Sequence, residues 1–424
     1  MLVLALATAA AVVVLRQRSG DLPSAGGVTP GPPSASTGDR SAAVADARTR
    51  GAVNLLRRLS TRLERGSPGS VRSLAAPGDR SAARELDALH HNVRVLRMTS
   101  LSLRLVGTDD RAAGAAGSDT WTSAVQVRWR LATDGAAASS VRVPVRFRQL
   151  PRAAGSGGIR FVTARSAGRG AVPLWILGRV FVARTLRSVI VSADPGRRRT
   201  FAALADRAVL GVRRVLPRWS GRLVVEVPRD ERQLDRILDA ASGTYASTAA
   251  VTTTADGSTS QRAPQHVVVN PRVFDPLGSR ASQFVMTHEA THVAMRATLS
   301  TMPLWLVEGF ADHVALRQFD VPVSRFAGRT LARVRRSGPP DRLPTDDDFG
   351  RRRPQLGGAY ESALLACRLI AKRYGERRLV AFYRASDRAG GTAGAFRTVL
   401  GTDEQAFTRT WRADLRRLAR STAG

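Results

Sequence analysis

Two histidines and a glutamate near the middle of the chain have the types and spacing of a metal site. They lie in the pentapeptide His288-Glu289-Ala290-Thr291-His292, inside an apolar stretch that favours a helix. Residues four apart share one helix face, so both imidazoles can reach one metal ion, with the Glu289 carboxylate beside it. The chain has only six histidines and nine glutamates, and a chance H-E-x-x-H match is expected about 0.002 times per chain. The pattern predicts a zinc site that activates water for hydrolysis.

A third ligand is expected on a second helix farther along the chain. Glu308 follows His292 by 16 residues and comes shortly after Pro303, which is favourable at a helix start. Apolar residues recur around it at helical spacing: Leu304, Val307, Phe310, Ala311 and Val314. Two histidines and one carboxylate leave the fourth position of zinc open for water. Asp312, one turn beyond Glu308, can accept the free N–H of a ligating histidine; a surface role for either acid is the alternative.

The two motifs together resemble the gluzincin zinc metallopeptidases, and more narrowly their bacterial peptidase MA-like group. The resemblance rests on His288-Glu289-x-x-His292 followed by Trp305-Leu306-x-Glu308-Gly309-x-Ala311. Farther along, Gly358-Ala359-Tyr360-Glu361-Ser362 opens an apolar helix, and a terminal helix carries Trp411. That order is similar to the helical C-terminal half of the family. The resemblance covers residues 200–420, about half of the chain.

The resemblance implies a role for each residue of the motifs. His288, His292 and Glu308 would bind zinc, and Glu289 would act as general base and then as general acid in peptide-bond hydrolysis. Tyr360 falls where related enzymes supply a phenol to the oxyanion of the tetrahedral intermediate; a packing role at the helix start is the alternative. The sequence has no Gly-x-Met-Glu-Asn stretch upstream, which would hold a substrate amino terminus. The resemblance therefore implies a peptidase without implying aminopeptidase specificity.

Composition limits the partners. The net charge is +32, and Lys372 is the only lysine, so arginine supplies nearly all of the positive charge. The arginines are scattered along the sequence and aromatic residues make up only 5% of it, so it offers neither a basic stretch nor a stacking platform for bases. We therefore expect no specific nucleic acid partner, whereas attraction to an anionic membrane surface or cell-wall polymer stays open. The single cysteine, Cys367, is typical of a small buried residue on a helix.

The first residues predict a membrane segment. Residues 1–18 contain an apolar run of 15, which suits a signal anchor or signal peptide better than a full bilayer span. Arg16 and Arg18 follow the run and no basic residue precedes it, which taken literally keeps the body of the protein in the cytoplasm. We expect instead that the true start lies upstream. Residues 19–41, rich in Gly, Pro, Ser and Thr, predict a flexible linker.

Residues 42–195 are expected to form an accessory α+β domain. Residues 42–64 and 82–89 predict helices, and strand-like alternation follows at 93–106, 120–131, 141–149 and 159–164. This order of elements resembles the cone-shaped NTF2-like fold. His90 and His91, at the end of the second helix, have no third ligand nearby in sequence and are interpreted as structural or solvated. The apolar stretch 172–182 is expected to be buried where the two domains meet.

Residues 196–424 are expected to form a gluzincin-type metallopeptidase domain with a small sheet and a mainly helical C-terminal half. Helices are predicted at 200–216 and 230–241, and strands at 222–227, 248–254 and 267–270. The last strand is expected at the sheet edge beside the metal, where it could pair with an extended peptide. His266 could line that cleft or be solvated. Asp346, Asp347 and Asp348 lack the spacing of a calcium loop and predict a solvated acidic turn.

These patterns predict an α+β protein with an N-terminal apolar anchor that hydrolyses peptide bonds, with Glu289 as general base. Its partners would be Zn²⁺, a peptide or protein substrate, and the membrane. We expect a single-pass cell-membrane protein whose catalytic domain is extracytoplasmic, or a secreted protein if the N-terminal segment is cleaved. The alternative is a catalytically silent, zinc-containing peptide-binding or scaffold protein at the cell surface. A third hypothesis is that the protein binds nucleic acid, which predicts a strongly salt-dependent affinity for DNA.

Overall fold

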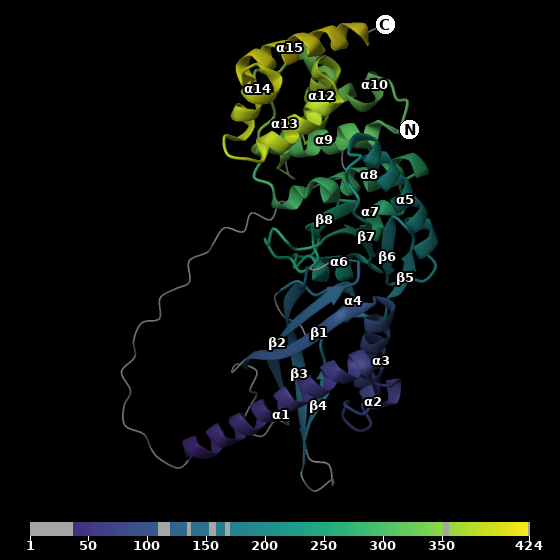
Figure 1. Ribbon diagram of the computed structural model, residues 1–424, viewed down its shortest axis with the longest axis vertical. Coiled ribbons are helices and arrows are strands. Elements are labelled where there is room, and N and C mark those ends of the chain that lie inside the picture. The colour runs from purple at the N-terminus through teal and green to yellow at the C-terminus, as the bar shows by residue number, and fades with distance from the viewer. Residues whose placement is uncertain are drawn as a thin grey trace, which may run out of the picture.

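Two β-sheets follow one another along the molecule, with helices on their faces, in the computed structural model of the chain (Figure 1). The structure describes residues 37–108, 119–133, 137–151, 158–165, 170–350 and 356–422. The protein is mixed α+β, as predicted. The apolar segment 1–18 and most of the linker expected at 19–41 lie outside the described residues. Within the described ranges, no helix combines the length and the apolar character needed to cross a membrane.

The first sheet is antiparallel and has the strand order β1-β2-β3-β4. Its strands are β1 (Met98–Thr108), β2 (Thr120–Leu131), β3 (Ser139–Leu150) and β4 (Gly158–Thr163). Buried residues alternate with more exposed ones along β2, because successive side chains point to opposite faces. The buried face packs against the leucines of helix α1 (Thr37–Arg65), which are Leu55, Leu56, Leu59 and Leu63. Helices α2 (Pro68–Arg72) and α3 (Arg80–Val95) complete this unit.

Two boundaries in the first unit differ from the prediction. Helix α1 begins at Thr37, so residues 37–41, expected in the linker, belong to the helix. The segment from residue 37 to residue 50 is rich in alanine and contains no proline, which favours this extension. Helix α3 continues to Val95, whereas a strand is predicted from residue 93, and the first strand begins only at Met98. Val93 is buried on the core face of α3, so tertiary packing outweighs its strand preference.

The second sheet has the strand order β5-β6-β7-β9-β8. Strands β6 (Ser188–Ser192), β7 (Leu223–Val227) and β9 (Gln265–Val269) run parallel, while β5 (Phe181–Arg184) and β8 (Ala250–Thr254) pair antiparallel at the two edges. All residues of the three parallel strands are buried, because both faces of the sheet are covered.

Two features of this sheet correct the predictions. The strand that follows residue 265 is an inner strand, because β9 pairs with β7 on one side and with β8 on the other; the edge strand is β8. Strands β5 and β6 come from the range 42–195, yet they pair with β7. The sheet therefore begins before residue 196, where the metallopeptidase domain is expected to start.

The stretch 172–180 joins the two sheets and contains the short helix α4 (Leu174–Leu177). Most of its side chains are buried in one core with both sheets, as predicted. Trp175 meets Trp129 of β2 edge-on, with ring centroids 5.7 Å apart. The buried side chain of Asn92 on α3 forms hydrogen bonds to three backbone groups of the stretch. The second sheet contributes valines of one face to this core, namely Val189, Val191, Val224, Val251 and Val268.

The other face of the second sheet carries the helices that build the candidate site (Figure 1). Helices α5 (Arg198–Val215) and α8 (Ser279–Met295) pack on this face, and α9 (Leu304–Leu316) packs on α8. The helical tail then consists of α10 (Val323–Phe326), α11 (Gly328–Ser337), α12 (Leu356–Tyr374), α13 (Glu376–Ser386), α14 (Gly391–Leu400) and α15 (Glu404–Ser421). The remaining elements are α6 (Glu231–Ile237), α7 (Pro271–Phe274) and the 3₁₀ helices η2 (Ala297–Leu299) and η3 (Asp346–Phe349).

The acidic turn is more than a solvated loop. Its aspartates open η3, where the carboxylate of Asp348 accepts the backbone N–H of Thr345 at 2.8 Å. The carboxylate of Asp346 accepts the backbone N–H of Leu304 at 2.8 Å, at the first residue of α9. An acidic side chain at a helix start satisfies a free N–H group and interacts favourably with the helix dipole. The turn therefore helps to fix the helix that carries Glu308.

Candidate metal centre

Helix α8 places both histidines of the pentapeptide on one side. Its central residues, from Ser282 to His292, are buried, because the helix lies between the second sheet, α5 and α9. The four-residue spacing turns the imidazoles of His288 and His292 toward the same neighbour, helix α9. Shortly after His292 the helix ends at Met295, where Arg296 adopts a left-handed backbone with φ of 55°. The turn that follows leads the chain back toward α9.

Helix α9 carries Glu308 and must come close to α12 behind it. Gly309, the next residue, lies at this crossing: a Cβ atom there would overlap the backbone carbonyl of Ala363 and lie 3.1 Å from the sulfur of Cys367. Cys367 is fully buried on α12, as predicted. Glycine thus permits the approach that sets the depth of α9 in the protein, and with it the position of the neighbouring carboxylate.

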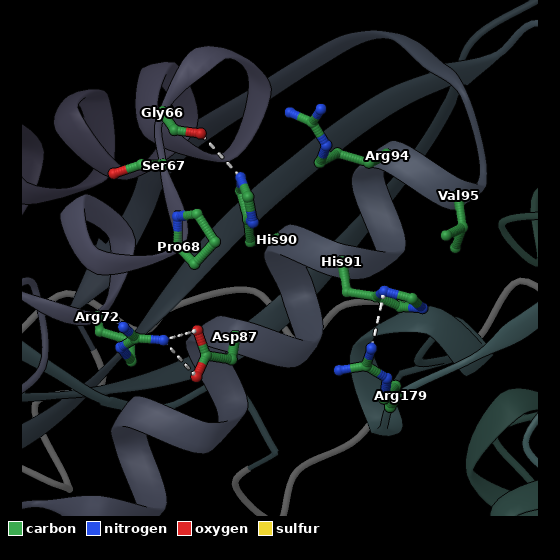
Figure 2. Close-up of a pocket in the computed structure, with 10 residues that line it drawn as sticks. All are labelled: Gly66, Ser67, Pro68, Arg72, Asp87, His90, His91, Arg94, Val95 and Arg179. Atoms are coloured by element: carbon green, nitrogen blue, oxygen red, sulfur yellow. Dashed lines mark hydrogen bonds and ion pairs between the residues drawn. The ribbon is translucent and has the colours of Figure 1, made fainter.

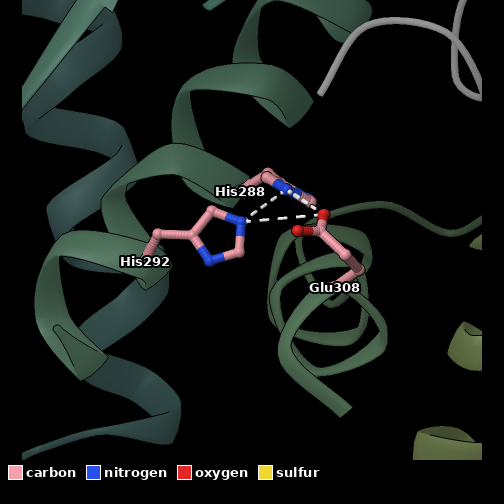
Figure 3. Close-up of side chains that lie close together, drawn as sticks. All are labelled: His288, His292 and Glu308. Carbon is pink, nitrogen blue, oxygen red and sulfur yellow. Dashed lines mark hydrogen bonds and ion pairs between the residues drawn. The ribbon is translucent and has the colours of Figure 1, made fainter. Parts of the chain in front are cut away.

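The three predicted ligands meet between α8 and α9 (Figure 3). The Nε2 atoms of His288 and His292 are 2.8 Å apart. One carboxylate oxygen of Glu308 lies 3.3 Å from the Nε2 atom of His288 and 3.8 Å from that of His292. None of these three side chains, nor that of Glu289, belongs to a residue more than 1% exposed. The structure therefore brings both histidines and the glutamate to one enclosed point.

Asp312 contacts the other nitrogen of His288. Its carboxylate accepts the Nδ1–H of that imidazole at 2.7 Å, and burial raises the pKa of Asp312 above its ordinary value. A proton held on Nδ1 leaves Nε2 as the nitrogen that can bind a metal. Asp312 thus fixes both the tautomer and the ring orientation of His288.

Glu289 follows His288 on α8 and is not part of the three-residue group. Thr252 of the edge strand β8 donates its hydroxyl to one carboxylate oxygen, Oε2, at 2.6 Å. The other oxygen, Oε1, is buried and has no hydrogen-bond partner within the described part of the chain. Burial raises the pKa of Glu289 to about 7. Among carboxylates, one with a pKa near neutrality is suited to both taking and giving a proton.

The pKa values of the two imidazoles are shifted in opposite directions. Burial alone would lower the pKa of His288, but hydrogen bonds to Asp312 and Glu308 outweigh burial and raise it well above the ordinary value. Burial, followed by the charge of His288, lowers the pKa of His292 well below the ordinary value. A metal ion binds only unprotonated nitrogen, so any proton on Nε2 of either imidazole must leave when an ion binds.

The donor set fits zinc. The ligand atoms of His288, His292 and Glu308 all lie within 4.8 Å of one another. Two imidazole nitrogens and one carboxylate oxygen form the protein part of many hydrolytic zinc sites, whereas structural sites use four protein ligands. No fourth His, Cys, Asp or Glu joins the group in the part of the chain that the structure describes. The set therefore leaves one position for water or substrate.

Two further candidates from the sequence, Tyr360 and His266, are both buried. Tyr360 is buried on α12, where its ring meets Phe349 edge-on with centroids 5.1 Å apart. Its catalytic role stays a prediction. His266 is buried on the inner strand β9 and donates its Nδ1–H to Glu226 of β7 at 2.8 Å. Side chains alternate along a strand, so His266 faces away from α8 and does not line a cleft beside that helix.

His90 and His91 have structural contacts, as the sequence indicates. His90 donates its Nε2–H to the carbonyl of Gly66 at 2.9 Å, and His91 donates its Nε2–H to the carbonyl of Val180 at 3.1 Å. The second nitrogen of His91 accepts from Arg179 (Figure 2). Both histidines line a surface cavity of about 660 Å³ in the first unit. Over the described residues, neither belongs to a group that could hold a metal ion.

Sequence reasoning missed Thr252. The strand that carries it is predicted at 248–254, and the structure places it at the sheet edge next to α8. The contact joins residues 37 positions apart, and a threonine in a strand gives no signal of its own because it is common there. Only the three-dimensional packing of β8 against α8 shows that Thr252 contacts Glu289.

Comparison of the chain with protein-family models, with curated proteins and with solved structures gives no match.

Proposed function

We propose that this protein is a zinc-dependent peptidase, tethered outside the cytoplasmic membrane by its N-terminal apolar segment. One observation carries the proposal: His288, His292 and Glu308 converge on one point from two helices, and the buried carboxyl of the adjacent Glu289 interacts electrostatically with His288 and Glu308. Three protein ligands and a free base form the arrangement of hydrolytic rather than structural zinc sites. Peptide hydrolysis is the reaction that the resemblance to the gluzincins adds.

His288, His292 and Glu308 would hold the ion. When bound, zinc acidifies water and polarises the carbonyl group of a substrate. Asp312 keeps the proton of His288 on Nδ1, so that Nε2 is available as a ligand, and it stabilises the orientation of the ring. These residues bind and orient; none of them needs to change its proton during the reaction.

Glu289 would carry the proton. Its free oxygen Oε1 takes a proton from the attacking water and returns it to the nitrogen of the leaving amine. Burial gives this carboxyl a pKa of about 7 before the charge of a bound cation is added, and a group that acts first as base and then as acid needs a pKa near neutrality. The enclosure of the site strengthens every electrostatic interaction made there.

The family assignment is part of the proposal. The mixed α+β architecture, the antiparallel edge strand beside α8 and the helical tail support a gluzincin of the peptidase MA-like group. Helices packed on a four-stranded antiparallel sheet support an NTF2-like first unit. Tyr360 is retained as a candidate oxyanion donor; its packing against Phe349 supports the alternative role.

The direct test combines metal analysis with peptide hydrolysis. We expect purified protein to hold one zinc per chain and to cleave a peptide mixture, and Glu289→Gln to keep its zinc but lose activity by about 100-fold or more, because it removes the proton acceptor. Glu361→Gln is the matched control, since Glu361 is also a buried glutamate and accepts a backbone N–H from Thr330. Its activity should stay near that of the wild type. An active Glu289→Gln protein would contradict the proposal.

A second candidate is a peptide-binding or scaffold protein that keeps zinc for structure. The observation that favours it is the enclosure of the cluster, where no ligand residue is more than 1% exposed. Wild-type protein that holds one zinc and binds peptides without cleaving them would establish this second function in place of the first.

A further inference from the structure

Thr252 holds one of the two carboxylate oxygens of Glu289. Its hydroxyl lies 2.6 Å from Oε2, and both residues are completely buried. This separation is in the range of a hydroxyl that donates to a charged carboxylate. The same hydroxyl lies 3.2 Å from the backbone carbonyl of Glu289, so the shorter contact to the side chain is the stronger one.

The two oxygens of Glu289 are therefore not equivalent. A hydroxyl group has a single proton to donate, and here it goes to Oε2. The other oxygen, Oε1, has no partner within the residues that the structure describes, although buried polar atoms usually have one. Because the bond to Thr252 also limits rotation of the carboxylate, Oε1 is held in one place.

We propose that Thr252 is a positioning residue that makes Oε1 of Glu289 the oxygen that moves the proton; this deepens, and rests on, the proposed peptidase function. As water attacks, its O–H bond breaks, a bond forms between the proton and Oε1, and the water oxygen bonds to the substrate carbonyl carbon. The same proton then passes from Oε1 to the amide nitrogen as the C–N bond breaks. Thr252 keeps its own proton throughout.

The test uses two substitutions of one side chain. Thr252→Val keeps the shape and removes the hydroxyl, and Thr252→Ser keeps the hydroxyl. Hydrogen bonds to charged groups contribute enough to change rates by about 10- to 100-fold. We expect kcat of Thr252→Val to fall by that factor with KM within about twofold of wild type, and Thr252→Ser to recover most of the loss. The zinc content should be unchanged in both.

Thr253→Val is the matched control. Thr253 is the next residue on β8 and points to the other face of the strand, so it does not face α8. The control should keep wild-type kcat and KM. A Thr252→Ser protein as slow as Thr252→Val, or a Thr253→Val protein equally impaired, would mean that the strand and not the hydroxyl matters, which would overturn the proposal.

A second measurement does not depend on activity. Unfolding of the zinc-free chain is followed for wild type, Thr252→Val, Glu289→Ala and the double variant. If the hydroxyl bonds to the carboxylate, the effect of Thr252→Val on the unfolding equilibrium constant should be about 10-fold larger with Glu289 present than with alanine there. If Thr252→Val has the same effect with Glu289 as with alanine at position 289, the two side chains do not interact and the proposal is overturned.

The outcomes separate the two proposals. Wild-type activity with an unaffected Thr252→Val protein rejects the positioning role and leaves the peptidase standing. A wild type that cleaves nothing rejects both, even where the unfolding cycle shows that the two side chains interact.

Discussion

Glu289 is completely buried, and among the residues that the structure describes only one of its carboxylate oxygens has a hydrogen-bond partner. In a protein interior such a carboxyl is more stable protonated than ionised, which is why burial raises its pKa to about 7. The site therefore holds a base that costs folding stability when no cation is bound.

This cost predicts a pH dependence for the zinc-free protein. An acid whose folded pKa is raised from 4.5 to about 7 leaves the folded state with more bound protons between those values, so stability falls as pH rises through this window. Glu289→Gln cannot ionise. Its stability relative to wild type should therefore rise by about 2.5 kcal/mol between pH 5 and pH 8.

Urea unfolding in the presence of a chelator measures this difference. Glu404→Gln, at the exposed first turn of α15, is the control and should give no such gain. A constant difference between Glu289→Gln and wild type from pH 5 to pH 8 would show that Glu289 is ionised in the folded protein.

The residues of the site were predictable to the extent that helical spacing fixes them. His288 and His292 share a face by their four-residue separation, and Asp312 follows Glu308 by the same spacing, so each pair is local. The contact of Thr252 with Glu289 depends instead on how β8 packs against α8 in the tertiary structure. Periodicity contains no information on such a contact, so the residue that orients the predicted base could not be found from the sequence.

The position of Glu308 depends on how closely two helices approach. Gly309 sits where α9 crosses α12, against the backbone of Ala363. Backbone atoms cannot move aside as the end of a long side chain can, so any added atom must push the helices apart. The helix that carries the third ligand would then shift relative to α8.

Gly309→Ala should weaken both the fold and the metal site. We expect a loss of about 1–3 kcal/mol of unfolding free energy from overpacking, together with weaker zinc binding measured against a competing chelator. Gly358→Ala is the matched control, because Gly358 lies on α12 with nothing near the added Cβ atom. It should bind zinc as wild type does and gain up to about 1 kcal/mol from the better helix former. Unchanged zinc affinity in Gly309→Ala would refute this dependence on helix spacing.

At the level of elements, the hydrophobic pattern predicts where a strand forms better than it predicts which strands become its neighbours in the sheet. Strands are predicted at 222–227, 248–254 and 267–270, and the structure has β7, β8 and β9 there. Their order in the sheet is not predictable from the pattern, because β8 comes before β9 in sequence but lies outside it. Strand β6 escaped prediction since its five residues are too few to separate a strand from a buried helix segment.

The two units of the molecule share a core. Valines on one face of the second sheet pack with the first sheet and with the stretch 172–180, and Asn92 binds that stretch through its side chain. Strands β5 and β6, which precede residue 196, complete the sheet on which α8 rests. Helices α8 and α9 thus depend on a part of the chain that precedes residue 196.

A fragment of residues 196–424 should therefore fail to fold. It lacks β6, whose buried Val189, Ile190 and Val191 contribute roughly 1.5–3 kcal/mol each, against a total stability of about 5–15 kcal/mol. We expect the fragment to aggregate, whereas residues 37–424 give a soluble monomeric or defined oligomeric species with cooperative unfolding. Size-exclusion chromatography and thermal melting compare the two. A soluble fragment with a cooperative melt would show that the units are independent.

The order in which these strands leave the ribosome then matters. Strands β5 and β6 emerge before β7 and β9, and β6 pairs with β7 only after α5 has been synthesised between them. Until then the nascent chain exposes the apolar strand β6 without its partner β7. Exposed apolar surface of this kind is what holdase chaperones bind. Biogenesis of this protein should accordingly be most vulnerable midway through translation, before His288, His292 and Glu308 have been added to the chain.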